Sequence, residues 1–173
     1  MSEMRIVIAG AAGRMGRMLI QAVDQTQGMR LAGALERPGS PALGQDASLQ
    51  AGCAASDVLI TDNALEALLH ADAIIDFTTP ASTVALAALA AQARVVHVIG
   101  TTGLSADDIA RIDAAARHAV VVRSGNMSLG VNLLAGLVKR AAATLGVDYD
   151  IEIVEMHHRM KVDAPSGTAL LLG

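Results

Sequence analysis

The sequence predicts an α/β protein with a doubly wound parallel sheet, followed by the start of a smaller α+β domain. Two observations carry this prediction. Short apolar runs rich in β-branched residues alternate with longer segments that have apolar residues at helical spacing. Such continuous apolar runs are typical of strands buried on both faces of a parallel sheet. A glycine-rich turn also follows the first run directly, where a β-α-β unit passes from strand to helix.

Six strands are expected in the first part of the chain, at residues 5–9, 31–35, 58–61, 73–77, 95–99 and 120–123. Four helices are expected between them, at residues 14–27, 64–70, 80–92 and 105–117. Gly28 ends the first helix, and Pro80 lies in the first turn of the third, where its missing N–H is tolerated. Ser105 caps the fourth helix, with Asp108 three residues later. The segment 37–57, rich in Gly, Pro, Ser and Ala, indicates a loop with space for one helical turn.

The pattern changes near residue 124. A long helix is expected at 131–145, a partly alternating strand at 150–158, and the first turns of another helix at the end of the chain. We place a domain boundary at about residue 128, which separates a dinucleotide-binding domain, 1–128, from a second domain, 129–173. One helix and one strand bury too little surface to fold alone. We therefore expect 129–173 to be the N-terminal part of a truncated substrate-binding and oligomerisation domain.

The composition argues against several classes of partner. Apolar residues make up 53% of the chain and charged residues 17%, which argues against disorder. There is no Trp, one Phe and one Tyr, and the net charge of −4 comes without a basic run, so no nucleic-acid partner is expected. No run approaches the roughly 18 apolar residues of a membrane span. A single cysteine, Cys53, and no signal peptide are consistent with a cytoplasmic location.

The turn after the first strand has the spacing of a nucleotide-binding motif. Gly10, Gly13 and Gly16 form the pattern G-x-x-G-x-x-G, in which Ala12 takes the place of the usual middle glycine. Glycines here allow a tight turn and close approach of the backbone to a pyrophosphate, whose charge the helix N-terminus favours. The turn therefore predicts a Rossmann-type dinucleotide site.

An acidic residue follows the second strand, where such folds bind ribose. Glu36 lies twenty residues after Gly16 and could accept hydrogen bonds from the adenosine ribose, whereas Arg37 could face a 2′-phosphate. The pair suggests that both NADH and NADPH are tolerated. The alternative interpretation is a salt bridge at the loop edge, or two solvated charges.

Two further loops lie at expected carboxyl ends of strands, where ligands of such sheets bind. They are 77–80, with the sequence Phe-Thr-Thr-Pro, and 100–103, with the sequence Gly-Thr-Thr-Gly. Their hydroxyl groups suit phosphate, ribose or carboxamide, although ordinary turn chemistry would explain them equally well. The segment 124–127 lies at the domain junction and is expected to meet the nicotinamide. The histidines His70, His97 and His118 have no partner in the sequence and are interpreted as structural.

The segment 155–170 gathers nitrogen-rich side chains before a helix start. His157, His158, Arg159 and Lys161 fall within five positions, and the turn that follows leads to a helix at Gly167 and Thr168. Cationic side chains beside free backbone N–H groups suit a small polyanion, so a small acidic substrate is expected. Lys161, among other cations, should have a lowered pKa and so serve as a proton donor. The adjacent histidines could belong to a metal site, but no third ligand has zinc spacing, so no metal is expected.

With these residues in view, the chain resembles the 4-hydroxy-tetrahydrodipicolinate reductase (dihydrodipicolinate reductase) family. The resemblance covers the whole chain and is carried by six strings: GAAGRMG at 10–16, ER at 36–37, DFTTP at 76–80, GTTG at 100–103, NMSLGVN at 126–132 and EMHHRMKVDAPSGTAL at 155–170. The last string is the most specific. Thr79 departs from the pattern, because some members carry a basic residue there.

The resemblance implies reduction of a small dicarboxylate, 4-hydroxy-tetrahydrodipicolinate, to tetrahydrodipicolinate by NADH or NADPH with loss of water, in the diaminopimelate route to lysine. It implies a Rossmann domain, a substrate domain and, at full length, a homotetramer. By the resemblance, His157 matches the proton donor and acceptor and Lys161 the proton donor, while His158, Gly167 and Thr168 match substrate contacts. The matching cofactor contacts are Gly10, Ala11, Ala12, Gly13, Arg14, Met15, Glu36, Arg37, Gly100, Thr101, Thr102, Ser124, Gly125, Asn126 and Met127.

Two other functions compete with this reductase. One is a nucleotide-binding fragment or sensor without catalytic activity, which would need no proton donor such as Lys161. The other is an oxidoreductase that acts through a cysteine, but Cys53 lies in a loop far from the strand ends that bind ligands.

Overall fold

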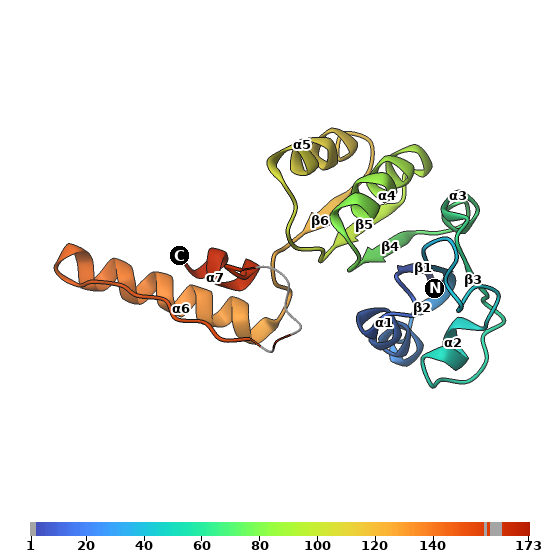
Figure 1. Cartoon of the computed structure of the whole chain (residues 1–173), viewed down its shortest axis with the longest axis horizontal. Coiled ribbons are helices and arrows are strands. Elements are labelled where there is room, and N and C mark those ends of the chain that lie inside the picture. The colour runs from blue at the N-terminus through green and yellow to red at the C-terminus, as the bar shows by residue number, and fades with distance from the viewer. Residues whose placement is uncertain (1–2, 158, 160–163) are drawn as a thin grey trace. The chain divides into compact units, whose positions relative to one another are not determined.

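The computed structural model describes residues 3–157, 159 and 164–173 (Figure 1). The contacts within the chain divide it into two compact units, Met1–Arg123 and Ser124–Gly173. No helix among the described residues combines the length and apolar character that crossing a membrane requires.

The first unit contains a six-stranded, entirely parallel sheet with the strand order β3-β2-β1-β4-β5-β6. The strands are β1 Met4–Ala9, β2 Met29–Leu35, β3 Ile60–Thr61, β4 Ala73–Asp76, β5 Val96–Ile99 and β6 Val121–Arg123. The chain fills one half of the sheet from β1 to β3 and then returns to place β4 on the other side of β1. This order confirms the doubly wound fold and puts the switch in strand order between β1 and β4.

Helices cover both faces of this sheet (Figure 1). They are α1 Arg14–Gln25, α2 Ala47–Gln50, α3 Ala64–Leu68, α4 Pro80–Ala93 and α5 Ala106–Ala115. Alternate residues of β1 serve the two faces: Ile6 and Ile8 belong to the core cluster with α1 and α2, and Val7 belongs to the cluster with α3 and α4. Because both faces are buried, β1 is apolar at every central position.

The N-terminal ends of α4 and α5 lie where the sequence signals predicted them. Ser105 and Asp108 form the expected reciprocal capping box at α5, and Pro80 opens α4 behind the N-cap Thr79. The helical turn expected within 37–57 is α2. The expected elements at 58–61 and 64–70 are shorter than predicted, at Ile60–Thr61 and Ala64–Leu68. Within the described sheet, β3 is the edge strand and pairs only with β2 over two residues, so fewer neighbours extend its hydrogen bonding.

The second unit contains α6 Leu129–Leu145, the 3₁₀ turn η1 Gly146–Asp148 and α7 Gly167–Leu172. After η1, the irregular segment 149–157 runs back along α6 (Figure 1). The strand predicted at 150–158 is wrong for its described part, because 151–157 has no regular secondary structure. A strand needs a partner for its backbone N–H and C=O groups, and the described residues of this unit offer no second strand.

Candidate functional site

The glycine turn connects β1 to α1 and needs glycine for two different reasons. Gly10 has a φ of +68°, in the left-handed region that favours glycine. Gly16 lies in the first turn of α1, where an added Cβ would stand 2.1 Å from the carbonyl oxygen of Gly10. The helix therefore approaches the turn more closely than any side chain would permit. Gly13 is the N-cap of α1 and donates its N–H to the Gly10 carbonyl at 2.9 Å.

The end of β2 is tied to this turn through Glu36. The N–H of Ala12 donates to Glu36 Oε1 at 3.1 Å, and the N–H of Arg37 donates to Glu36 Oε2 at 3.1 Å. The N–H of Ala11 donates to the Leu35 carbonyl at 3.0 Å. Glu36 makes no salt bridge among the described residues. Its carboxylate is therefore held between the turn and the following loop by backbone donors, which argues against the loop-edge salt bridge.

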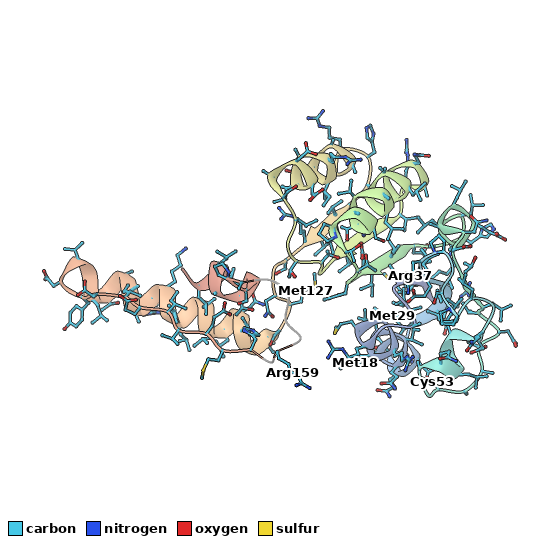
Figure 2. The ribbon with its side chains drawn as sticks, viewed as in Figure 1. Met18, Met29, Arg37, Cys53, Met127 and Arg159 are labelled. Carbon is cyan, nitrogen blue, oxygen red and sulfur yellow. The ribbon has the colours of Figure 1, made fainter. Side chains whose placement is uncertain are left out.

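A cavity of about 390 Å³ opens beside Glu36 at the carboxyl ends of β1, β2 and β4. Its polar rim includes Glu36, Arg37 and Thr78, and Figure 2 labels Arg37 at this end of β2. The other lining residues are Ala9, Gly10, Leu35, Pro38, Asp62, Ala64, Ser82, Ala85, Leu86 and Leu89. A mostly apolar wall with a few polar groups is typical of small-molecule sites, and it lies where the strand order reverses.

The two hydroxyl-bearing loops after β4 and β5 are joined by a buried polar cluster. Asp76 Oδ1 accepts hydrogen bonds from the Thr78 N–H at 2.9 Å, the Thr78 hydroxyl at 2.6 Å and the Thr101 hydroxyl at 3.4 Å. The Thr83 hydroxyl donates to Thr101 Oγ1 at 2.8 Å. His97 Nε2 lies 3.2 Å from Asp76 Oδ2, and neither side chain is exposed. Hydrogen bonds to a buried carboxylate, in addition to ordinary turn geometry, therefore hold these two loops in place.

The same loops also pack through an aromatic ring. An added Cβ at Gly100 would stand 2.1 Å from Cε1 of Phe77, and the Gly100 N–H donates to the Asp76 carbonyl at 2.8 Å. Glycine at this position therefore lets the second loop lie directly against the first.

In the second unit, Asn126 joins the segment before α6 to the start of α7. Its Nδ2 donates to Thr168 Oγ1 at 2.8 Å, and its Oδ1 accepts the N–H of Ser128 at 2.8 Å. Ser124 Oγ donates to the Asn126 carbonyl at 2.8 Å, and Gly125 packs close to the Gly167 carbonyl. Predicted cofactor and substrate residues that are 42 positions apart therefore lie together here.

Glu155 connects described residues of the basic segment, residues 155–170. Its Oε1 accepts the N–H of Ser166 at 2.7 Å, and its Oε2 lies 3.1 Å from Nδ1 of His157. Ser166 in turn caps α7 by accepting the Ala169 N–H at 3.0 Å. The carboxylate therefore favours a proton on Nδ1 of His157 and joins that histidine to the helix start. Two predicted site residues, His158 and Lys161, lie outside the described residues.

Four residues of this arrangement were not predicted as parts of the site: Asp76, Thr83, His97 and Glu155. Two of them carry a signal in the sequence, since Asp76 and His97 are polar residues inside apolar strand runs. A buried polar residue requires a partner, so each of the two indicates the need for the other. Glu155 lacks such a signal, because an acidic residue in an irregular segment is ordinarily solvated.

The single thiol lies away from this site. Cys53 packs against the core cluster on the α1 and α2 face, and it is not among the residues that line the cavity (Figure 2). Burial and the neighbouring carboxylate of Asp24 raise the pKa of the Cys53 thiol, which disfavours the nucleophilic thiolate. Among the described residues, no group of three or more His, Cys, Asp or Glu side chains is placed to hold a metal ion.

Comparison with solved structures supports the fold. A dipicolinate-bound dihydrodipicolinate reductase from Paenisporosarcina sp. TG-14 superposes with a TM-score of 0.69 at 30% identity, covering 98% of this chain and 65% of that chain. A scyllo-inositol dehydrogenase from Lactobacillus casei with bound NAD(H) and scyllo-inositol gives a TM-score of 0.60 at 17% identity, covering 81% of this chain and 42% of that chain. The second similarity is one of fold alone.

Sequence comparison identifies the family. The chain is 68% identical over 173 residues to a 4-hydroxy-tetrahydrodipicolinate reductase of Beijerinckia indica subsp. indica and 67% identical to one of Methylocella silvestris. Each alignment covers all of this chain, which spans 64% of the length of these relatives. Family models described as "Dihydrodipicolinate reductase, N-terminus" and "Dihydrodipicolinate reductase, C-terminus" match residues 4–127 and 130–173. The chain therefore belongs to the dihydrodipicolinate reductase family.

Proposed function

We propose that this chain carries the dinucleotide site and the catalytic segment of a 4-hydroxy-tetrahydrodipicolinate reductase. The reaction is the reduction of 4-hydroxy-tetrahydrodipicolinate by NADH or NADPH to tetrahydrodipicolinate with loss of water, in the diaminopimelate route to lysine. The observation that carries the proposal is the Glu36 carboxylate, held by the N–H groups of Ala12 and Arg37 at the rim of the cavity. For the full-length protein, the proposal includes a cytoplasmic homotetramer.

The cavity suits the adenosine half of the cofactor. Glu36 uses one lone pair of each oxygen on the backbone, so each oxygen can still accept a hydrogen bond from a ribose hydroxyl. Arg37, on the same rim, would meet a 2′-phosphate. The turn from Gly10 to Met15 would hold the pyrophosphate through the N–H groups of Arg14 and Met15 in the first turn of α1, since those of Ala11, Ala12 and Gly13 already donate to protein oxygens. Gly100, Thr101, Thr102 and the segment 124–127 complete the proposed cofactor contacts.

The basic segment is assigned to the substrate. A bound reduced nicotinamide would supply the hydride, which leaves electron density on the ring that an acid must quench. We assign the proton donor to Lys161 and a proton donor and acceptor role to His157. Glu155 supports the latter, because a proton held on Nδ1 fixes the orientation of the ring. His158, Gly167 and Thr168 are assigned to the substrate carboxylates.

Binding of the cofactor is tested first, by the rise in nicotinamide fluorescence on titration with NADH and NADPH. Glu36→Gln should weaken NADH binding about tenfold or more, since it removes the charge and turns one acceptor oxygen into an NH2 donor that faces a backbone N–H. NADPH should be affected less, because the carboxylate also repels a 2′-phosphate. Glu3→Gln is the matched control, since Glu3 is an exposed acid that precedes β1, whereas the glycine turn follows that strand. Equal effects of the two substitutions would contradict the assignment.

Turnover separates the reductase from a nucleotide sensor. Oxidation of NADH is followed in the presence of freshly made condensation product of pyruvate and aspartate semialdehyde. Substrate-dependent oxidation that Lys161→Ala abolishes supports the reductase. Tight NADH binding without any oxidation would favour the sensor, and absence of NADH binding would refute both.

A further inference from the structure

Among its described residues, the first unit has one pair of titratable side chains that is fully buried and has no part in the proposed chemistry. Asp76 at the end of β4 and His97 on β5 are both 0% exposed. The strand register pairs His97 with Ile74 and Asp76 with Ile99. His97 is therefore level with a residue two positions before Asp76 on β4. Its imidazole extends toward the carboxyl ends of the strands, where Nε2 lies 3.2 Å from Asp76 Oδ2.

The two oxygens of Asp76 have different partners. Oδ2 faces His97, while Oδ1 accepts from Thr78 and Thr101, one residue in each ligand loop. Thr101 Oγ1 also accepts the Thr78 N–H at 3.1 Å and the Thr83 hydroxyl at 2.8 Å. A rotation of the carboxylate would therefore break contacts to both loops at once. His97 is the partner on the side away from those loops.

One of the two loops that Asp76 holds reaches the dinucleotide cavity through Thr78, and the other is bonded to Thr78 through Thr101. Thr78 lines the cavity, and its Cγ2 lies 3.0 Å from the place that a Cβ on Gly10 would occupy. The Thr78 methyl group is thus in contact with the glycine turn. Any shift of Thr78 changes the space between β1 and β4, where the strand order reverses.

The chemistry of the pair selects one arrangement of protons. Burial raises the pKa of Asp76, but hydrogen bonds from His97 and Thr78 outweigh burial and hold that pKa below its usual value. The carboxylate is then an acceptor only, and His97 must donate from Nε2. Nδ1 of His97 is buried and has no hydrogen-bond partner among the described residues. A neutral ring with its proton on Nε2 leaves an acceptor unpaired, whereas a charged ring would bury an unpaired N–H.

We propose that His97 is a positioning residue for the dinucleotide site. By donating from Nε2 to one oxygen of Asp76, it orients the other oxygen toward Thr78 and Thr101 and so holds both ligand loops in their binding geometry. The inference rests on the proposed function, because it concerns how the same cavity receives the dinucleotide. His97, first interpreted as merely structural, thereby acquires a role in affinity.

Two substitutions at His97 test the role of its donor. His97→Leu removes the donor at nearly unchanged volume, and His97→Gln offers an amide N–H close to the place of Nε2. We expect His97→Leu to weaken NADH binding about tenfold or more, as for a lost hydrogen bond to a buried charge. His97→Gln should restore affinity to within about threefold. Circular dichroism at the titration temperature verifies that each variant is folded.

Thr83→Val provides an independent route to the same network, because Thr83 is fully buried and is not one of the proposed cofactor contacts. It removes the hydroxyl that donates to Thr101 Oγ1 without touching His97, and it should lower NADH affinity by a similar factor. In the double variant with His97→Leu, the two losses should be less than multiplicative, because both act through Asp76. Fully multiplicative losses, or a folded His97→Leu variant with normal affinity, would overturn the inference.

Hydrogen–deuterium exchange supplies a readout that needs no ligand. In the free chain, His97→Leu should accelerate exchange in peptides that cover 77–80 and 100–103 and leave the β1 peptide unchanged. Unchanged exchange in those loops would sink the inference even if the unsubstituted chain failed to bind NADH. Absence of NADH binding by the unsubstituted chain, with faster loop exchange in the variant, would instead refute the proposed function alone.

Discussion

Replacement of Gly16 by alanine tests the closest contact in the glycine turn. In an open helical position this change favours folding by up to about 1 kcal/mol, because glycine is the poorer helix former. At Gly16 the new methyl group would stand 2.1 Å from the Gly10 carbonyl oxygen and 2.7 Å from Cα of Ala11, where ordinary contacts begin at 3.4 Å. The atoms it meets are backbone atoms, so no side-chain rotation relieves the overlap.

The clash should outweigh the gain in helix propensity. Overpacking of this kind costs about 1–3 kcal/mol, and the rigid surroundings place Gly16 at the upper end of that range. We therefore expect a net loss of about 2 kcal/mol and a fall in melting temperature of roughly 8 °C for a unit of this size. Displacement of the glycine turn should also shift Glu36, which the Ala12 N–H holds, and weaken NADH binding about tenfold or more.

Thermal unfolding followed by circular dichroism and NADH titration measure the two effects. Gly136→Ala is the matched control, because Gly136 lies inside α6 and an added Cβ there would meet nothing within 4 Å. The control should keep its NADH affinity and be no less stable. If Gly16→Ala were as stable and bound NADH as tightly as the control, the argument from close approach would be wrong.

Three further substitutions test separate features. The hydrogen bond from the Arg5 side chain holds the pKa of Asp72 at about 2, below its usual 3.8. The pair therefore stabilises the fold above pH 4, and this stabilisation is lost as the pH falls toward 2. Asp72→Asn should flatten the melting-temperature profile between pH 4 and pH 2. Ser105→Ala should lower stability by about 1 kcal/mol in urea unfolding through loss of the α5 cap. Gly100→Ala should lower NADH affinity in titrations, and Phe77→Leu in the same chain should restore part of it, since the clash is with the Phe77 ring.

The fold of the first unit was predictable because its determinants are local. Strands buried on both faces are continuous apolar runs, and the helix ends carry their own signals at Pro80 and Ser105. The second unit shows the limit of such signals. The alternation at 150–158 predicted a strand, but pairing is a long-range property, and 151–157 has no partner strand among the described residues.

The candidate site divides in the same way. The glycine turn and Glu36 follow from a spacing within one β-α-β unit, and the structure brings them together through the Ala12 N–H. Asp76 and His97 are 21 residues apart in the sequence, and their pairing depends on the register of β4 and β5, which no local pattern specifies. A polar residue in an apolar strand indicates the need for a partner, but the identity of that partner comes only from the fold.

The two halves of the proposed chemistry draw on different kinds of stability. The dinucleotide cavity is built on a sheet whose core strands are buried on both faces. In 124–157, 159 and 164–173, by contrast, Ser166 is the only buried residue, and polar contacts join its parts, among them the bonds from the Ser166 N–H to Glu155 and from the Asn126 amide to Thr168. A typical hydrogen bond contributes only about 1 kcal/mol, so local opening should reach the proposed catalytic residues near His157 long before it reaches the cavity. Loss of turnover without loss of dinucleotide binding is therefore what a partly destabilised chain should display.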